Sequence, residues 1–387
     1  MRTRPILGAE MVAASTGPVT YHSDAMYYNH YDAQLVLRGK NPYETDDLAG
    51  AMRQFRILGY TPLLRGRFGD PLRPPTAAEI DAVGREYLAD PNHPPAEIDP
   101  RTLHSYPAGA MLVNVPSVWA GMPSVGLAQL LLFLGLGVGV VALAPGWSRV
   151  AVALLFLSDP DTVRRVATGD FDIWWVALLS CAWLLRERRV ASGLLLGAAC
   201  AIKQTAWFAA PFYLVFIWRA YGGREALRRG GIALAGFLAL NLPWLLSPRA
   251  WLTSLTLPMS LPLFPEGVGV VALSLSGAFP LPPSWVYGAL ELAALGLALV
   301  WLWRSHSAHP LAGLALSLLP LVFAWRSPGR YFALLPALAL VGWALTERPY
   351  ARGAIIPGGA QARAGQRYRG RRPSSTASVW SFPFAMG

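Results

Sequence analysis

The sequence predicts an all-α, polytopic integral membrane protein with about eight to ten spans and a polar, mostly helical and irregular region ahead of them. Hydrophobic residues make up 54% of the 387 residues and charged residues only 14%, which leaves too little polar surface for a soluble globule. Several apolar runs also reach about 15–22 residues, and roughly 20 residues in a helix cross the hydrocarbon core of a bilayer. Composition and run length together therefore favour a membrane protein.

The apolar runs give the expected positions of the spans. We predict clear spans over 123–144, 170–185, 190–204, 205–218, 230–246, 284–303, 310–325 and 331–345. Two weaker runs, 150–158 and 267–279, are too short to cross a membrane upright, so we expect tilted or half-inserted segments there.

Three regions follow along the chain. Residues 1–122 are polar and rich in proline, and we expect them outside the cytoplasm, ending in a short interfacial helix over 107–122. Residues 123–345 form the transmembrane helical body. Residues 346–387 lack periodicity and are predicted to be an Arg-rich, disordered tail.

Two helices are expected in the polar region. The segment 24–38 can form one helix, and 76–89 shows a helical pattern. Thr76 opens this second helix and Glu79 follows three residues later, which is the pattern of a capping box.

The net charge of +11 does not indicate nucleic-acid binding. Six arginines and no acid lie in 350–387, and most of the remaining excess lies in short loops between apolar runs. Arginines in such loops are typical of the cytoplasmic side of a membrane protein. The expected partners are therefore membrane lipids and not nucleic acid.

The Arg-bearing loops predict which segments share a side of the membrane. Loops 186–189 and 219–229 are separated by two spans, so both are expected on the cytoplasmic side. Counting spans outward places 159–170, Lys203-Gln204, 247–266, 326–330 and the N-terminal region on the opposite side. Arg164 and Arg165 contradict this rule.

Carboxylates and cations gather on that opposite side. They are Asp24, Asp32, Asp159, Asp161, Asp170, Asp172, Lys203, Arg249, Arg326 and Arg330. Ionisable groups near a membrane are costly, so such a cluster needs partners or a function. Acids beside cations suit sugar transfer from a phosphate-linked donor, because an Asp can take the acceptor's proton while Lys or Arg stabilises the leaving phosphate.

Structural alternatives stay open for each of these residues. Asp24 can serve as a helix cap, Asp170 can begin a helix, and Lys203 can extend to the membrane surface. Arg326 and Arg330 flank a turn, which could be a plain interfacial turn. Asp32 follows Asp24 by about two helical turns, so both could lie on one helical face. No residue shows the spacing of metal ligands, and a need for a divalent metal ion is left open.

Four motifs, in this order, resemble a known family. They are Ser23-Asp24 through Tyr27-Tyr28 with Leu37-Arg38-Gly39-Lys40-Asn41-Pro42-Tyr43, Ser105-Tyr106-Pro107, the stretch from Gly193 to Gln204, and the stretch from Ser327 to Pro336. The chain resembles bacterial polyprenol-phosphate-dependent glycosyltransferases of the GT-C class, in particular their alpha-mannosyltransferase-like branch.

The resemblance implies a function and a site. It implies a hexosyltransferase that moves a mannose-like sugar from a polyprenyl-phosphate donor to a lipid, glycan or protein acceptor at the extracytoplasmic face of the cell membrane. It implies Asp24 as the catalytic base, and Lys203, Arg326 and Arg330 near the donor phosphate. The expected supporting residues are Asp32, Tyr28, Asn41, Asp170 and Gln204.

One departure from the family leaves two alternatives. Such enzymes begin with a transmembrane helix ahead of the Asp loop, and no apolar run of that length precedes Asp24 here. An inactive truncated homologue is therefore one alternative. A transporter or flippase of lipid-linked sugars is the other, although no internal repeat is visible.

Overall fold

The computed structural model describes residues 21–346, except for 22, 46, 147, 159, 169–170, 307–308 and 310. Within these residues the chain is almost wholly helical, and its one sheet is a parallel pair of two-residue strands. The predicted all-α class is confirmed. The expected Arg-rich tail and Asp170 lie outside the described residues.

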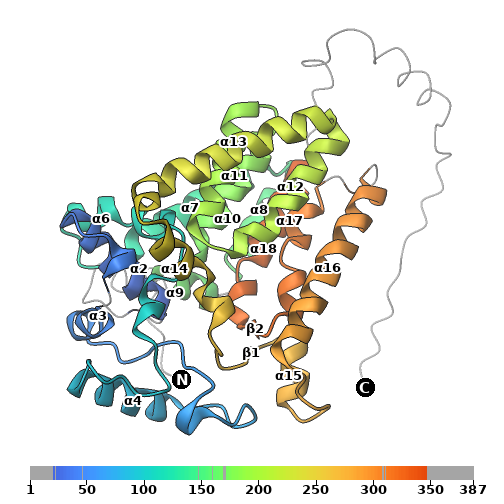
Figure 1. Ribbon diagram of the computed structural model, residues 1–387. Coiled ribbons are helices and arrows are strands. Elements are labelled where there is room, and N and C mark those ends of the chain that lie inside the picture. Colours follow the sequence, from blue (N-terminus) through green and yellow to red (C-terminus); the bar gives the residue numbers. More distant parts are fainter. Residues whose placement is uncertain are drawn as a thin grey trace, which may run out of the picture. The chain divides into compact units, whose positions relative to one another are not determined.

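The N-terminal region is a set of short helices beside the helical body, drawn in blue to cyan in Figure 1. Its elements are α2 (Asp24–Leu37), η1 (Pro42–Glu44), α3 (Leu48–Phe55), η2 (Gly66–Phe68), α4 (Ala77–Ala89), η3 (Pro100–His104), α5 (Gly109–Leu112) and α6 (Val115–Trp119). Helix α2 and the capping box of α4 are confirmed, with Thr76 and Glu79 bonded reciprocally. The single helix expected over 107–122 is instead the two short helices α5 and α6.

The remaining elements form the apolar body and the segments that close it. They are α7 (Gly126–Leu143), α8 (Ser148–Phe156), α9 (Pro160–Ala167), α10 (Asp172–Leu184), α11 (Arg189–Ile202), α12 (Thr205–Tyr221), α13 (Gly223–Asn241), η4 (Leu242–Leu246), α14 (Pro248–Ser260), β1 (Glu266–Gly267), α15 (Val270–Leu275), α16 (Ser284–Ser305), α17 (Gly313–Leu316), η5 (Pro320–Phe323), β2 (Arg326–Ser327), η6 (Gly329–Phe332) and α18 (Leu335–Thr346).

Four helical segments among the described residues are long and apolar enough to cross a membrane. They are Gly126–Leu143, Gly223–Leu246, Ser284–Ser305 and Gly329–Thr346. Helices α10 and α11 are apolar but shorter, and the expected span over 310–325 is broken into α17 and η5. Pro320 explains this break, because proline lacks the amide hydrogen that a continuous helix needs at that position. The chain is thus a polytopic membrane protein with discontinuous apolar helices.

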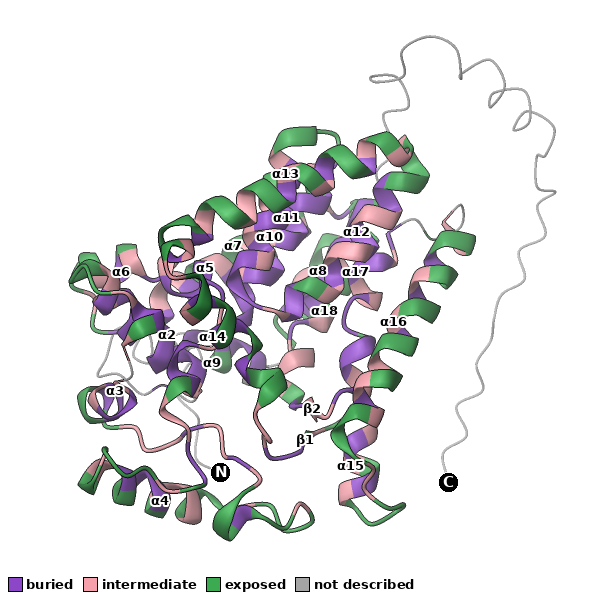
Figure 2. Cartoon of the chain, viewed as in Figure 1, coloured by how far each residue is buried: buried purple, intermediate pink, exposed green. Residues whose placement is uncertain are grey.

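Small residues hold the centre of the body together. A Cβ atom on Gly197 of α11 would collide with the backbone of Ala233 in α13, so these helices approach as closely as glycine allows. Such small-residue contacts are typical of packing between membrane helices. Figure 2 shows that α10 and α11 are largely buried, whereas α16 is exposed along much of its length.

The two Arg-bearing loops meet at one end of the body. The buried guanidinium of Arg229 donates hydrogen bonds to the Arg186 carbonyl and the Ser192 hydroxyl, and it pairs with Glu225 at 2.9 Å. Arg189 pairs with the same carboxylate at 2.8 Å. The sequence prediction that loops 186–189 and 219–229 share a side therefore agrees with the fold.

Candidate active site

Asp24 is held at the first turn of α2 by hydrogen bonds to both of its carboxylate oxygens. Ser23 has an extended backbone and is the N-cap residue of α2, so Asp24 is the first residue of the helix. A negative charge is favourable there, because the N-terminal end of a helix carries a partial positive charge. The backbone amide of Ala25 donates to Oδ1 at 2.8 Å, and the Thr61 hydroxyl donates to Oδ2 at 2.5 Å. The side chain keeps 12% of its surface exposed. The carboxylate is therefore largely buried, but part of its surface stays exposed to solvent or a ligand.

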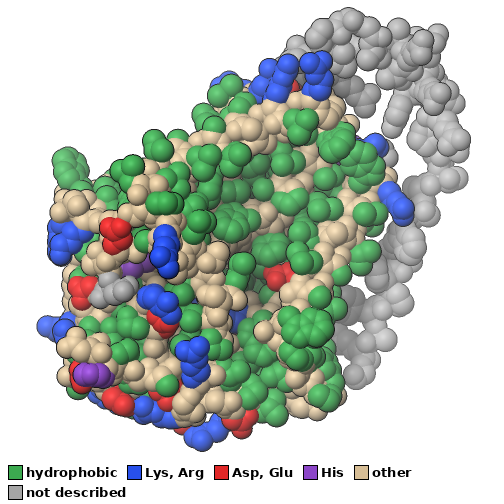
Figure 3. Space-filling view, in the orientation of Figure 1, with side chains coloured by type: hydrophobic (Ala, Val, Ile, Leu, Met, Phe, Trp, Pro, Cys, Tyr) green, Lys and Arg blue, Asp and Glu red, His purple; other side chains and the backbone are tan. Residues whose placement is uncertain are grey.

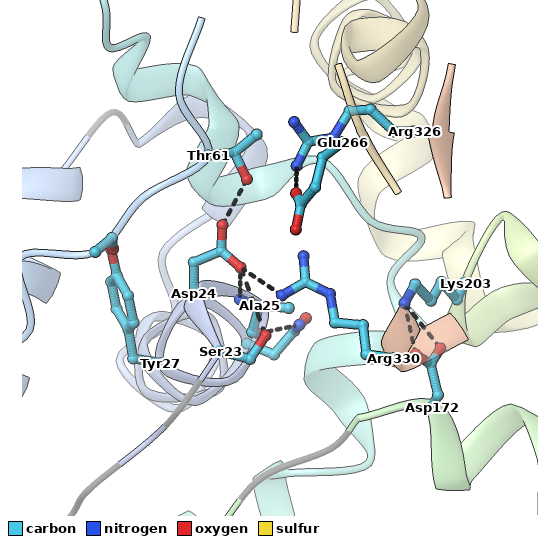
Figure 4. A network of polar contacts seen from close by, with 12 residues as sticks. Ser23, Asp24, Ala25, Tyr27, Thr61, Asp172, Lys203, Glu266, Arg326 and Arg330 are labelled. Atoms are coloured by element: carbon cyan, nitrogen blue, oxygen red, sulfur yellow. Dashed lines mark hydrogen bonds and ion pairs between the residues drawn. The ribbon is translucent and has the colours of Figure 1, made fainter. Parts of the chain in front are cut away.

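Arg330 brings a positive charge to this carboxylate from the other end of the described chain. Its Nη1 atom lies 4.0 Å from Oδ1 of Asp24, and its side chain is 32% exposed. Arg330 belongs to the short helix η6, which follows directly after β2. Figure 4 shows the guanidinium pointing from η6 toward Asp24.

A second acid and a second arginine complete the cluster. The parallel pair of β1 and β2 places Glu266 opposite Arg326, and their side chains form an ion pair at 2.8 Å. Arg326 also donates to the Phe264 carbonyl at 2.5 Å. Glu266 is about half exposed and points into the space beside Asp24 and Arg330 in Figure 4. Acids and arginines therefore alternate across the site.

Lys203 lies next to this cluster but is already paired. Its ammonium group contacts both oxygens of Asp172, at 2.8 and 3.0 Å, and both side chains are buried. The indole of Trp175 also donates to Asp172 at 2.6 Å. The ammonium group lies 4.6 Å from the ring centre of Tyr331, the residue after Arg330. Lys203 therefore lies beside the Asp24 cluster, and its positive charge is already paired with Asp172.

The cations keep Asp24 ionised. Burial alone would raise the pKa of Asp24, but the charge of Arg330, the Thr61 hydroxyl, the Ala25 amide and the charge of Arg326 together hold it below its usual value. Asp24 is therefore a carboxylate at neutral pH and can accept a proton.

Two tyrosines beside Asp24 are kept protonated. Burial raises the pKa of Tyr106, and burial together with the charge of Asp24 raises that of Tyr28. The charges of Lys203 and Arg330 oppose this rise for Tyr106. Both hydroxyl groups are therefore uncharged at neutral pH.

The other expected supporting residues have structural partners. Asp32 pairs with His104 at 2.8 Å, and burial raises the pKa of Asp32 while His104 opposes that rise. Asn41 accepts a hydrogen bond from the Tyr43 amide at the start of η1. Gln204 donates to the carbonyls of Ser105 and Leu255. Asp32, Asn41 and Gln204 therefore support the frame around the site.

Two residues of the cluster were not expected from the sequence. Thr61 lies in a loop between α3 and η2 that carries no motif, so nothing in the sequence indicates its bond to Asp24. Glu266 did leave a signal, because it is the one acid in the segment 247–266 that was placed on the same side as Asp24. Among the described residues, no three His, Cys, Asp or Glu side chains gather as a metal site.

The arrangement combines a carboxylate base with guanidinium groups that can bind an anion. The two groups lie 4.0 Å apart, and both side chains keep part of their surface exposed. A hydroxyl group could lose its proton to Asp24 while a negative charge develops beside Arg330.

Comparison with known proteins gives the class of the chain. It matches no curated protein and no solved structure. The family model of glycosyltransferase family 87 matches residues 104–329. This range contains Asp172, Lys203, Glu266 and Arg326, whereas Asp24 and Arg330 lie outside it. Because the match spans more than half of the sequence, the chain belongs to glycosyltransferase family 87.

Proposed function

We propose that this membrane glycosyltransferase moves a hexose, mannose-like in kind, from a polyprenyl-phosphate donor to a hydroxyl group of a lipid, glycan or protein acceptor. The observation that carries the proposal is the contact between Asp24 and Arg330, 4.0 Å apart, on elements from opposite ends of the described chain. A base and an anion-binding group this close suit transfer from a phosphate-linked sugar better than either group alone.

In the proposed reaction Asp24 acts as the general base. The acceptor hydroxyl transfers its proton to the Asp24 carboxylate as its oxygen attacks the anomeric carbon of the donor. The bond between this carbon and the phosphate oxygen breaks, and the phosphate leaves with the bonding electrons. The attack from the opposite face inverts the anomeric carbon. The depressed pKa of Asp24 means that its carboxylate is present at neutral pH.

The leaving phosphate is proposed to contact the cations of the cluster. Arg330 is the nearest to Asp24, and a planar guanidinium can donate two hydrogen bonds to a phosphate. Arg326 is oriented by its ion pair with Glu266. Lys203 lies close to the same region, because its ammonium group contacts the ring of Tyr331, the residue after Arg330. We assign Arg330 the main contact, because Lys203 already shares its charge with Asp172.

We place the reaction at the extracytoplasmic face of the cell membrane. The arginine-rich loops lie together at one end of the body, joined by Arg229 and Arg189 to Glu225. Short loops rich in arginine are typical of the cytoplasmic side. The Asp24 cluster is built from the segments predicted to lie at the opposite end.

The substitution Asp24→Asn tests the proposal. It keeps the shape of the side chain and removes the proton acceptor, so we expect a loss of transfer of about 10²–10⁴-fold, the usual contribution of a general base. The assay measures sugar transfer from a polyprenyl-phosphate sugar to acceptors in reconstituted membranes. Asp81→Asn on α4, for which the structure records no hydrogen bond or ion pair, is the matched control and is expected to keep full activity.

Two results would contradict this assignment. Unchanged transfer by Asp24→Asn would remove Asp24 as the base. Movement of the lipid-linked sugar across the membrane without any glycosidic product, in the unsubstituted chain, would favour a transporter instead.

A further inference from the structure

A second cavity lies apart from the Asp24 cluster and carries its own set of polar groups. It is open to the surface, has a volume of about 470 Å³, and is lined by residues of η1, η3 and α14. Arg101, Arg249 and Ser254 line it, together with Tyr43 and Glu44. In Figure 3, basic side chains gather on the left of the view together with acidic ones, whereas hydrophobic side chains cover most of the centre.

Tyr43 and Tyr106 lie between this cavity and the proposed active site. Tyr43 lines the cavity, and its hydroxyl donates to the backbone carbonyl of Tyr106 at 2.8 Å. Tyr106 in turn interacts electrostatically with Asp24 and Lys203 of the proposed active site. A ligand in the cavity would therefore lie beside the active site without entering it.

Unused hydrogen-bond donors gather at the start of α14. Arg249 is exposed and forms no ion pair within the described part of the chain. The Ser247 side chain does not cap the helix, so the amides of the first turn, including those of Arg249 and Ala250, stay free of side-chain partners. Such amides favour an anion, because the N-terminal end of a helix carries a partial positive charge.

A buried hydroxyl supports the same interpretation. Ser254 lines the cavity with 8% of its surface exposed, and the structure records no hydrogen bond for its side chain. Arg101 adds a second guanidinium, which is partly balanced by Asp99 at 2.6 Å. Glu44 is the one carboxylate that lines the cavity, and it is exposed. Donors therefore outnumber acceptors, as an anion requires.

The surroundings of Arg249 indicate where the anion comes from. Leu246, Leu252 and Met259 flank the cavity in sequence and are 88%, 53% and 80% exposed. Large apolar side chains this exposed are unfavourable in water but normal against lipid. Arg249 between them would lie at the level of lipid headgroups, where arginine side chains commonly extend.

We propose that this cavity binds the phosphate group of an anionic phospholipid, with Arg249, the free amides of α14 and Ser254 as its donors. The apolar side chains of η4 and α14 contact the acyl chains of the same lipid. The proposal is independent of the sugar-transfer chemistry assigned to Asp24.

Lipid binding by the purified full-length protein tests this proposal. The protein is held in a neutral detergent and titrated with phosphatidylglycerol, and native mass spectrometry counts the bound lipid. We expect Arg249→Gln to weaken binding about 10-fold, the usual effect of losing one charge-assisted contact. Ser254→Leu fills the cavity without changing any charge and is expected to weaken binding as well. Arg165→Gln is the matched control, because Arg165 is also exposed but lies in α9, away from the cavity.

The outcomes separate the possible sources of the phosphate. If millimolar inorganic phosphate displaces the bound lipid, the cavity recognises the phosphate group itself. If inorganic phosphate does not compete but lipid binding still depends on Arg249, the site recognises the intact lipid. Equal binding by Arg249→Gln and the unsubstituted protein would overturn the proposal. An equal loss in Arg165→Gln would overturn it too, because binding would then depend on overall charge.

Discussion

Removing the charge of Arg330 is expected to impair sugar transfer in a way that depends on pH. Two unit charges 4.0 Å apart interact with about 4 kcal/mol at an effective dielectric constant near 20. Arg330 is 32% exposed, so solvent screening reduces this interaction free energy to about 1–2 kcal/mol. The interaction stabilises the ionised form of Asp24, whose pKa it lowers.

Arg330→Gln therefore has two effects on the transfer rate. Loss of the proposed contact to the leaving phosphate is expected to lower the rate about 10²–10³-fold at neutral pH. The pKa of Asp24 also rises, because the cost of burial is no longer opposed by Arg330. As pH falls, the variant therefore loses its carboxylate base before the unsubstituted protein does. An interaction of about 1–2 kcal/mol makes the deficit grow by a further factor of about 5–30 on the acid side.

The assay measures the initial rate of transfer from a polyprenyl-phosphate sugar in reconstituted membranes, from neutral to acidic pH. Arg330→Lys is the control, because it keeps the charge and loses the fork of two donors. Its rate falls, but its deficit does not grow with acidity. If the deficit of Arg330→Gln is the same at every pH, Arg330 does not act on Asp24, and the reasoning from their contact is refuted.

Three further substitutions test the frame of the site. Lys203→Gln removes the cation that balances the buried charge of Asp172, so it is expected to lower the free energy of unfolding by about 3–5 kcal/mol, measured by thermal unfolding of the purified protein. Adding Asp172→Asn should recover much of this loss. Gly197→Ala pushes α11 away from Ala233 of α13 and is expected to cost about 1–3 kcal/mol in the same assay. Thr76→Ala removes the cap of α4 and is expected to cost about 1 kcal/mol without changing transfer.

Each of these has an outcome that contradicts it. Additive losses for Lys203→Gln and Asp172→Asn would mean that the two side chains do not interact. Unchanged stability of Gly197→Ala, with Gly231→Ala as the control at a position with open space, would mean that α11 and α13 are not in close contact. A loss of transfer in Thr76→Ala would show that α4 contributes to the site.

Local patterns in the sequence predicted the parts of the fold that depend on neighbouring residues. The capping box at Thr76 and the helix that begins at Asp24 depend on contacts within a few residues, and both are confirmed. The break at Pro320 was missed, because an apolar run of suitable length predicts a span even where proline interrupts it. The prediction that loops 186–189 and 219–229 share a side agrees with the fold, because two successive helical spans return the chain to the side from which it started.

The partners within the site could be predicted only in part. Sequence and topology placed Asp24, Lys203 and Arg330 on one side, and the structure brings them close together. The pairing of Lys203 with Asp172, and the contact of Thr61 with Asp24, depend on helix rotation and loop path. Neither contact is encoded by spacing in a single sequence, so neither could be predicted before the structure.

The contact between Asp24 and Arg330 also has a consequence for biosynthesis. Chains emerge from the ribosome with their N-terminal part first, so the carboxylate is made 306 residues before its guanidinium partner. The short β1–β2 pairing that positions Arg326 beside Glu266 must likewise wait for the late segment. A nascent chain would therefore be inserted and largely assembled before it could act on any sugar.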